Sequence, residues 1–215
     1  MEELPAFKRR CVISTRAKWA AVSCVVVVLG VIALPAGACR TDGGPDVYVG
    51  SCKPPAGFRV VRSRTTRVEG QVIRATTWKW NEEAKALRPV RTQIIAIPAG
   101  KKAVNAVEEY ATREVAGKRE TIRFSKIACP DAKTLRRSIT DMQQSFAVPH
   151  VELDRPLVGQ RTWVSKSPNS DSLVIMCTSG LTLIRVYVSS PKLNAEKLRT
   201  LAVKIIKDTL APKPQ

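Results

Sequence analysis

The sequence has few of the residues that most often build metal sites and active sites. It contains one histidine, His150, and three methionines. No two of its six cysteines have the two-residue spacing of a zinc knuckle, and no glycine-rich phosphate-binding loop occurs. Eleven glycines and fourteen prolines are too few for a collagen-like or low-complexity chain. We therefore predict a folded protein with no metal, no cofactor and no enzymatic activity.

The few arrangements that could support catalysis are weak. His150 could serve as the base for a thiol nucleophile at Cys129 or Cys177, but a cysteine in a disulfide cannot act in this way. Adjacent acids such as Glu108 and Glu109 point apart on a helix or a strand and do not converge. A small hydrolase acting on the cell wall or on lipid stays as the alternative to a binding function.

Acidic residues are scarce relative to basic ones. Thirty-six Lys and Arg stand against eighteen Asp and Glu, which gives the 215 residues a net charge of +18. The first 18 residues hold five of the basic and two of the acidic residues, so a net charge of +15 remains after them. Such an excess creates a positive surface potential that attracts anions.

The basic residues concentrate in two segments, 59–91 and 118–137, and we predict that these segments bind an anionic partner. The candidate binding residues are Arg62, Arg64, Arg67, Arg74, Arg88, Arg91, Lys118, Arg119 and Arg123. Outside the cell the suitable anions are phospholipids, wall polymers and acidic proteins, whereas export makes nucleic acid a poor partner. A protein-interaction domain with no anionic ligand is a further alternative, because a cationic composition can also serve solubility alone.

The N-terminus has the three parts of an export signal. A basic head is followed by sixteen uncharged residues, Trp19–Leu34, and then by the small residues 36–38. We predict a signal peptide or membrane anchor over residues 1–38. Three fates fit: cleavage after Ala38, attachment of a lipid to Cys39, and an uncleaved transmembrane helix. Each predicts an exported protein that is either secreted or attached to the cell membrane.

Four cysteines follow this segment, and an oxidising compartment favours disulfide bonds between them. Four cysteines allow three pairings. We predict a bond between Cys129 and Cys177, because both lie in or beside strand-like segments. Cys39 and Cys52 would then close a short loop if Cys39 carries no lipid.

The remaining chain divides by composition. Residues 39–57 are rich in glycine and proline and predict a flexible tether, residues 58–211 have the size of a single domain, and residues 212–215 predict a loose tail. Segments rich in Val, Ile, Thr and Trp predict strands at Phe58–Arg64, Val68–Trp80 and Val90–Ile97, and later at Thr121–Ala128, Arg161–Lys166, Leu173–Cys177 and Leu181–Ser189.

Helical spacing of apolar residues predicts helices over 101–116, after Pro130, and from Asn194 or Ser190 to Leu210. Because strands precede helices in each half, we expect an α+β fold: a single domain with an antiparallel sheet and two or three helices packed on one face.

The pattern resembles small bacterial secreted and lipoprotein domains, including the extracellular sensor domains of Ser/Thr kinases. The features that carry this resemblance are the export signal, the tether, the late strand that holds Cys177 and the terminal amphipathic helix. The segment QIIAIPAGKKAVNAVEEYATREV is similar to the strand-to-helix step of the PsbP-like fold. The resemblance implies a binding or sensing module and assigns no functional residue.

Overall fold

A computed structural model describes residues 54–145, 149–166 and 171–211. The expected signal segment, most of the expected tether, Cys39, Cys52 and the expected tail lie outside these residues. Within them the structure contains nine strands and two helices. They are β1 (Arg59–Glu69), β2 (Val72–Asn81), β3 (Ala86–Ala96), β4 (Asn105–Val115), β5 (Lys118–Ala128), α1 (Ala132–Gln144), β6 (Val151–Glu152), β7 (Arg161–Lys166), β8 (Ser172–Ser179), β9 (Thr182–Ser189) and α2 (Ala195–Leu210).

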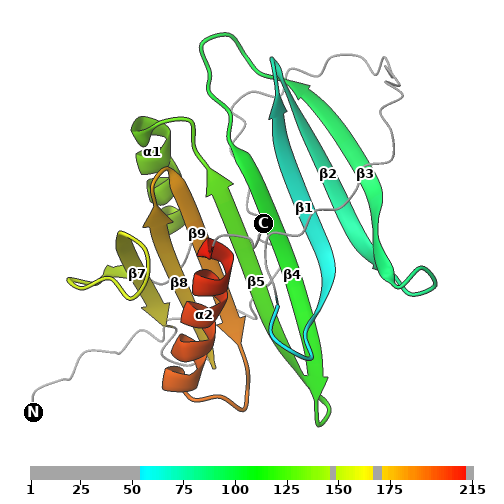
Figure 1. Cartoon of the computed structure of the whole chain (residues 1–215), viewed down its shortest axis with the longest axis vertical. Helices are drawn as coiled ribbons and strands as arrows, with labels where there is room; N and C mark the ends of the chain where they lie inside the picture. The colour runs from blue at the N-terminus through cyan, green and yellow to red at the C-terminus, as the bar shows by residue number, and fades with distance from the viewer. Residues whose placement is uncertain (1–53, 146–148, 167–170, 212–215) are drawn as a thin grey trace, which may run out of the picture. The chain divides into compact units, whose positions relative to one another are not determined.

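All nine strands form one antiparallel sheet with the order β3-β2-β1-β4-β5-β9-β8-β7-β6 (Figure 1). The five long strands β1 to β5 are neighbours in this order and run from one edge of the sheet to its middle. Strand β9 pairs with β5 and joins the second half of the chain to the first. One edge of the sheet is the long strand β3, and the other is the two-residue strand β6.

Tight turns set the register of the long hairpins. Val115 pairs with Lys118 across the β4–β5 turn, which leaves only Ala116 and Gly117 in the loop. Both loop residues have positive φ, 51° and 70°, as a type I′ hairpin turn requires. Glycine adopts this conformation without strain, and Ala116 adopts it at some cost.

Helix α2 covers one face of the sheet over β8 and β9 (Figure 1). Its buried residues Leu198, Ala202, Ile205 and Ile206 contact the main hydrophobic core. The sheet supplies this core with alternate residues of its central strands, namely Ile122, Phe124, Leu173, Ile175, Cys177, Ile184, Val186 and Val188. The helix begins after Asn194, whose side chain accepts a hydrogen bond from the backbone N–H of Lys197.

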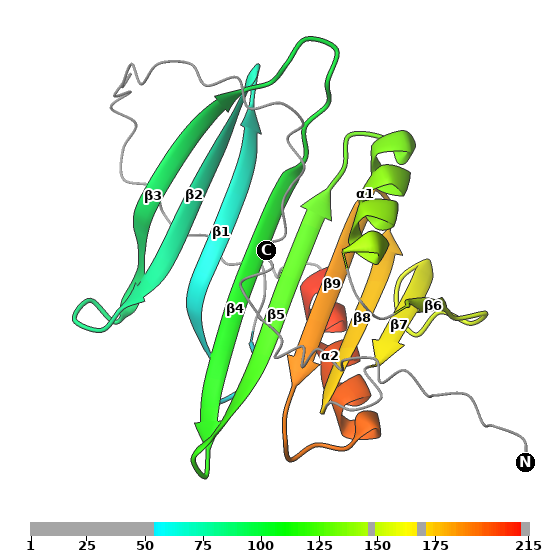
Figure 2. The same ribbon diagram turned by 180° about the vertical axis from the view of Figure 1, so that it is seen from behind.

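Helix α1 lies on the opposite face. Its residues Ile139 and Met142 pack with Trp163, Met176 and Leu183 in a second, smaller core. Met176 is the strand neighbour of Cys177, and successive residues of a strand point to opposite faces of the sheet. The reverse view shows α1 in front of one end of β8 and β9, with α2 behind them (Figure 2).

The expected fold class is therefore wrong. In the described residues the structure is mostly one large sheet with two helices on opposite faces, rather than a sheet with its helices gathered on one face. The principal error is the helix expected over 101–116, where Asn105–Val115 forms β4, an interior strand of the sheet. Pairing with β1 and β5 on both sides satisfies the backbone of this segment and outweighs the helical spacing of its apolar residues.

The predicted bond between Cys129 and Cys177 is also not present. Both residues are buried free cysteines. Cys177 belongs to the core beneath α2, whereas the Sγ of Cys129 lies 3.7 Å from the Oγ of Ser138 on α1. The two thiols therefore lie on opposite faces of the sheet, which separates them.

Neither helix of the described ranges has the length and apolar character that a membrane crossing requires. The transmembrane helix considered for the N-terminus falls in the part of the chain that the structure does not describe.

Candidate functional site: a cationic strip across six strands

Two adjacent cross-strand rows of side chains gather positive charge on the α1 face of the sheet. The first row crosses β9, β5, β4, β1, β2 and β3 and consists of Tyr187, Arg123, Tyr110, Arg62, Lys79 and Arg88. The second row crosses the same strands nearer to α1 and consists of Arg185, Ser125, Glu108, Arg64, Thr77 and Arg91. We call these twelve residues the cationic strip.

The strip holds seven cations and one carboxylate. Strand pairing places all twelve side chains on one face, because directly paired residues point to the same side of a sheet. Contacts between neighbouring strands within each row agree with this placement. The guanidinium of Arg185 donates a hydrogen bond to the Oγ of Ser125 at 3.2 Å, and the guanidinium carbon of Arg123 lies 5.6 Å from the ring centres of both Tyr110 and Tyr187.

Most cations of the strip have no carboxylate partner. Carboxylates such as Glu69, whose Oε2 lies 3.0 Å from the Nε of Arg74, pair with cations outside the strip. The strip cations without an ion pair to any described residue are Arg62, Arg64, Lys79, Arg88, Arg91 and Arg123. Their charge is available to a ligand.

Arg185 and Glu108 are the two least exposed charged residues of the strip. Arg185 is only 8% exposed, although it carries a full positive charge in the middle of β9. Burial raises the pKa of Glu108, and the nearby charges of Arg185, Arg64 and Arg62 oppose that rise. His150 lies close enough to Arg185 to be affected by its charge, and burial followed by that charge lowers the pKa of the imidazole. The imidazole is therefore neutral at pH 7.

On the opposite face of β4 and β5, a buried carboxylate is paired with an arginine. Glu120 is buried there and receives hydrogen bonds from the Nε of Arg113 and the Oγ of Ser190, both at 2.5 Å. Burial raises the pKa of Glu120, but these two donors together hold it below its usual value. This carboxylate neutralises Arg113 and ties β4 and β5 to the chain after β9, so the cluster is structural.

The structure separates the nine predicted binding residues. It brings together five of them, namely Arg62, Arg64, Arg88, Arg91 and Arg123. Arg67 and Arg74 pair with each other on the opposite face. Lys118 and Arg119 lie at the β4–β5 turn, where Arg119 is 3.6 Å from Glu114.

The candidate list omitted Lys79 and Arg185. Lys79 belongs to the same basic segment as Arg74, but only the strand register shows that it shares a face with Arg62. For Arg185 a signal was present in the sequence: it is the one charged residue within the apolar strand LTLIRVYVS. A charge retained in such a strand indicates a polar surface or a buried partner.

The cysteine and histidine side chains that could support catalysis do not converge on one site. Burial raises the pKa of the Cys177 thiol to about 12, and burial also raises that of Cys129, so neither is a ready thiolate nucleophile. Cys177 faces α2, on the side of the sheet opposite to Arg185 and His150. Within the described ranges no cluster of three or more His, Cys, Asp or Glu side chains could hold a metal ion.

Comparisons with protein-family models, curated proteins and solved structures found no match. The resemblance to bacterial sensor and PsbP-like domains is therefore untested as a whole. Its one specific element, a strand-to-helix step after residue 93, is a strand-to-strand step from β3 to β4.

Proposed function

We propose that the sheet domain is a non-enzymatic module of an exported cell-envelope protein and that it binds an anionic partner through the cationic strip. The observation that carries this proposal is the concentration of seven cations and one carboxylate in two neighbouring rows of one sheet face. Six of these cations lack an ion pair with any described residue, so binding an anion breaks no existing salt bridge. The exported location rests on the N-terminal sequence alone.

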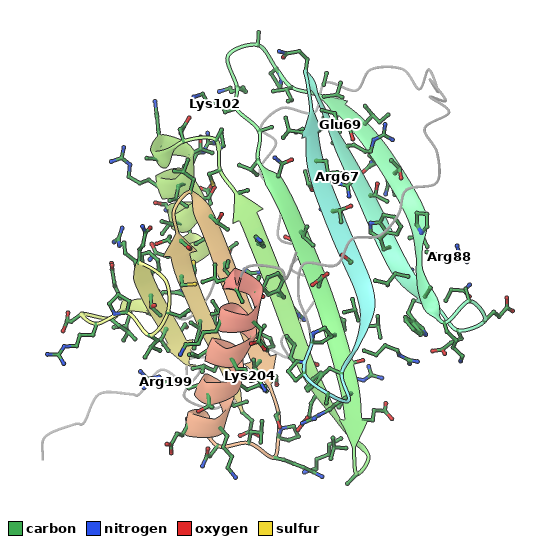
Figure 3. All side chains as sticks on the ribbon, in the orientation of Figure 1. Arg67, Glu69, Arg88, Lys102, Arg199 and Lys204 are labelled. Carbon is green, nitrogen blue, oxygen red and sulfur yellow. The ribbon has the colours of Figure 1, made fainter. Side chains whose placement is uncertain are left out.

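The test compares two triple variants of the full-length chain that remove the same charge from opposite faces. The strip variant is Arg62→Gln, Lys79→Gln and Arg123→Gln. The control variant is Arg67→Gln, Arg199→Gln and Lys204→Gln, which replaces exposed cations on β1 and α2 (Figure 3). Exposed substitutions of this kind change stability little, and circular dichroism verifies that both variants fold.

Binding is measured with three polyanionic probes: long-chain inorganic polyphosphate, vesicles that contain phosphatidylglycerol, and polyglutamate. We expect the strip variant to bind at least one probe ten-fold or more weakly than the unchanged protein. The control variant should stay within about three-fold, because its charges lie outside the strip. Equal losses in the two variants would show that net charge alone drives binding, and the proposal would then be wrong.

A further inference from the structure

We infer that the partner is a linear polyanion that lies across the strands, along the cationic strip. The inference rests on the proposed function and specifies its ligand. The first row is continuous over six neighbouring strands, which is a span of about 24 Å at roughly 4.8 Å per strand. Four of its six positions are cations, at Arg123, Arg62, Lys79 and Arg88. A chain with regularly repeated anionic groups is the ligand whose charges can follow such a row.

The row is preorganised at one end. Arg123 lies between the half-buried rings of Tyr110 and Tyr187, and cation–π contacts on both sides restrict its guanidinium group. A side chain that is already ordered loses less conformational entropy when it binds a ligand. The two tyrosine rings also offer surfaces on which the uncharged links of a polymer can pack.

The narrow shape of the strip favours an extended chain over a folded acidic protein as its ligand. The two rows lie about 7 Å apart along the strands, so the strip covers on the order of 170 Å². A stable protein–protein interface buries about 800 Å² on each partner. A narrow chain can contact all of the strip without needing a larger surface.

The position of α1 disfavours a flat membrane. The helix packs over Leu183, four residues before Tyr187 on the same strand, which is roughly 13 Å away. A helix has a diameter of about 10 Å or more, and α1 stands in front of this face of the sheet (Figure 2). A bilayer resting on α1 would be held away from Arg123, whereas a thin polymer passes beside the helix.

The distribution of apolar residues agrees with this conclusion. The large hydrophobic side chains that are exposed in the described ranges are Val90, Ile94, Val151 and Leu181, and none belongs to either row. Neither row therefore contains an exposed aliphatic side chain for insertion between lipid tails, which membrane-surface elements normally provide.

The experiment uses the full-length chain and inorganic polyphosphates of defined length, from tripolyphosphate to chains longer than the strip. Arg123 and Arg88 lie four strand steps apart in the first row, about 19 Å. The variants are Arg123→Gln, Arg88→Gln and the double variant, with Arg67→Gln as the control on the opposite face. We expect affinity to rise with chain length and to level off once the chain spans the row.

The two ends of the row should then respond differently to short and long chains. A long chain contacts both ends, so each single variant should weaken binding about three-fold or more, and the effects should multiply. A short chain can move to the intact end, so each single variant should have a small effect and the double variant a large one. This pattern would support a polymer that lies along the row.

Other outcomes overturn the inference, and they separate it from the proposed function. Affinity that is independent of chain length and sensitive to only one of the two arginines would indicate a compact anion. Strip-dependent binding that is stronger to phosphatidylglycerol vesicles than to polyphosphate of equal charge concentration would indicate a lipid surface. In both cases the inference fails and the proposed function stands. If none of the probes depends on the strip, both fail.

Discussion

Arg64 of β1 and Glu108 of β4 are direct cross-strand partners in the cationic strip. Glu108 is the one carboxylate among the twelve strip residues, and it reduces the positive potential at their centre. Burial raises its pKa, so it becomes neutral at a higher pH than an ordinary glutamate does. The charge of the strip therefore depends on the state of this residue.

The change Glu108→Gln should strengthen polyanion binding. Removing one negative charge beside a bound anion contributes about 1 kcal/mol at low salt, which corresponds to about a five-fold increase in affinity. Isothermal titration with long-chain polyphosphate at pH 7 measures the effect. Unchanged or weaker binding by this variant would contradict the placement of the ligand over the strip.

Binding should also strengthen as the pH falls, because protonation of Glu108 removes its charge. The groups that act on Glu108 are Arg62 and Arg64 from β1 and Arg185 from β9, and they keep their charge throughout. His150 gains charge only below its usual range, because its pKa is lowered. We therefore expect Glu108→Gln to weaken the pH dependence of polyphosphate binding, measured by titration at several pH values, because the raised pKa makes Glu108 gain its proton above the usual range of a glutamate.

The Cys177 thiol should resist alkylation in the folded protein. Cys177 is 0% exposed, and a pKa of about 12 leaves on the order of one thiolate in ten thousand molecules at pH 8. Peptide mapping after iodoacetamide treatment should find Cys177 modified only when the protein is unfolded, with Cys129 modified sooner. Recovery of a disulfide-linked Cys129–Cys177 peptide from the native protein would contradict the arrangement of these two residues.

Local sequence patterns predicted several elements well. Segments rich in strand-forming residues predicted the strands that became β1, β7, β8 and β9, and apolar spacing predicted α1 and α2, with a capping residue expected for α2. These elements follow from near-neighbour preferences: strand alternation, helical periodicity, and the side-chain cap at Asn194.

Such local patterns do not show which strands pair when they are far apart in the sequence. Residues 101–116 have apolar residues at helical spacing, and the pairing of β4 with β1 and β5 on either side decides in favour of a strand. The cationic strip also depends on the pairing of distant strands. Arg62, Tyr110 and Arg123 are far apart in the sequence, and only the register of three strands places them in one row. Composition alone predicted that cations matter, without indicating which of them lie together.

The contact between Asp131 and Lys102 should make stability depend on pH. The carboxylate caps α1 by accepting a hydrogen bond from the N–H of Thr134 at 2.7 Å, and its Oδ2 lies 2.5 Å from the Nζ of Lys102. The hydrogen bond from Lys102, followed by that from Thr134, holds the pKa of Asp131 well below its usual range.

A lowered pKa in the folded state means that the ionised form stabilises the fold above the unfolded-state pKa, near 4. This contribution is lost as the pH falls further. Asp131→Ala should therefore lower the thermal midpoint at pH 7, and the difference from the unchanged protein should shrink toward pH 2. Thermal unfolding at several pH values tests this, with Asp141→Ala, an exposed acid near the other end of α1, as the control. A difference that grows as the pH falls would contradict the assignment.

Ile205→Ala should separate stability from binding. Ile205 of α2 is 1% exposed in the main core, and such truncations cost about 2–5 kcal/mol of unfolding free energy. Lys204→Ala, its exposed neighbour, should cost less than about 0.5 kcal/mol. Because α2 and the strip lie on opposite faces of the sheet, Ile205→Ala should bind polyphosphate with unchanged affinity wherever it remains folded. Urea unfolding and titration on the same sample measure both quantities. Weaker binding by the fully folded variant would mean that the packing beneath α2 controls the geometry of the strip through β9, which the present arrangement of the two faces does not require.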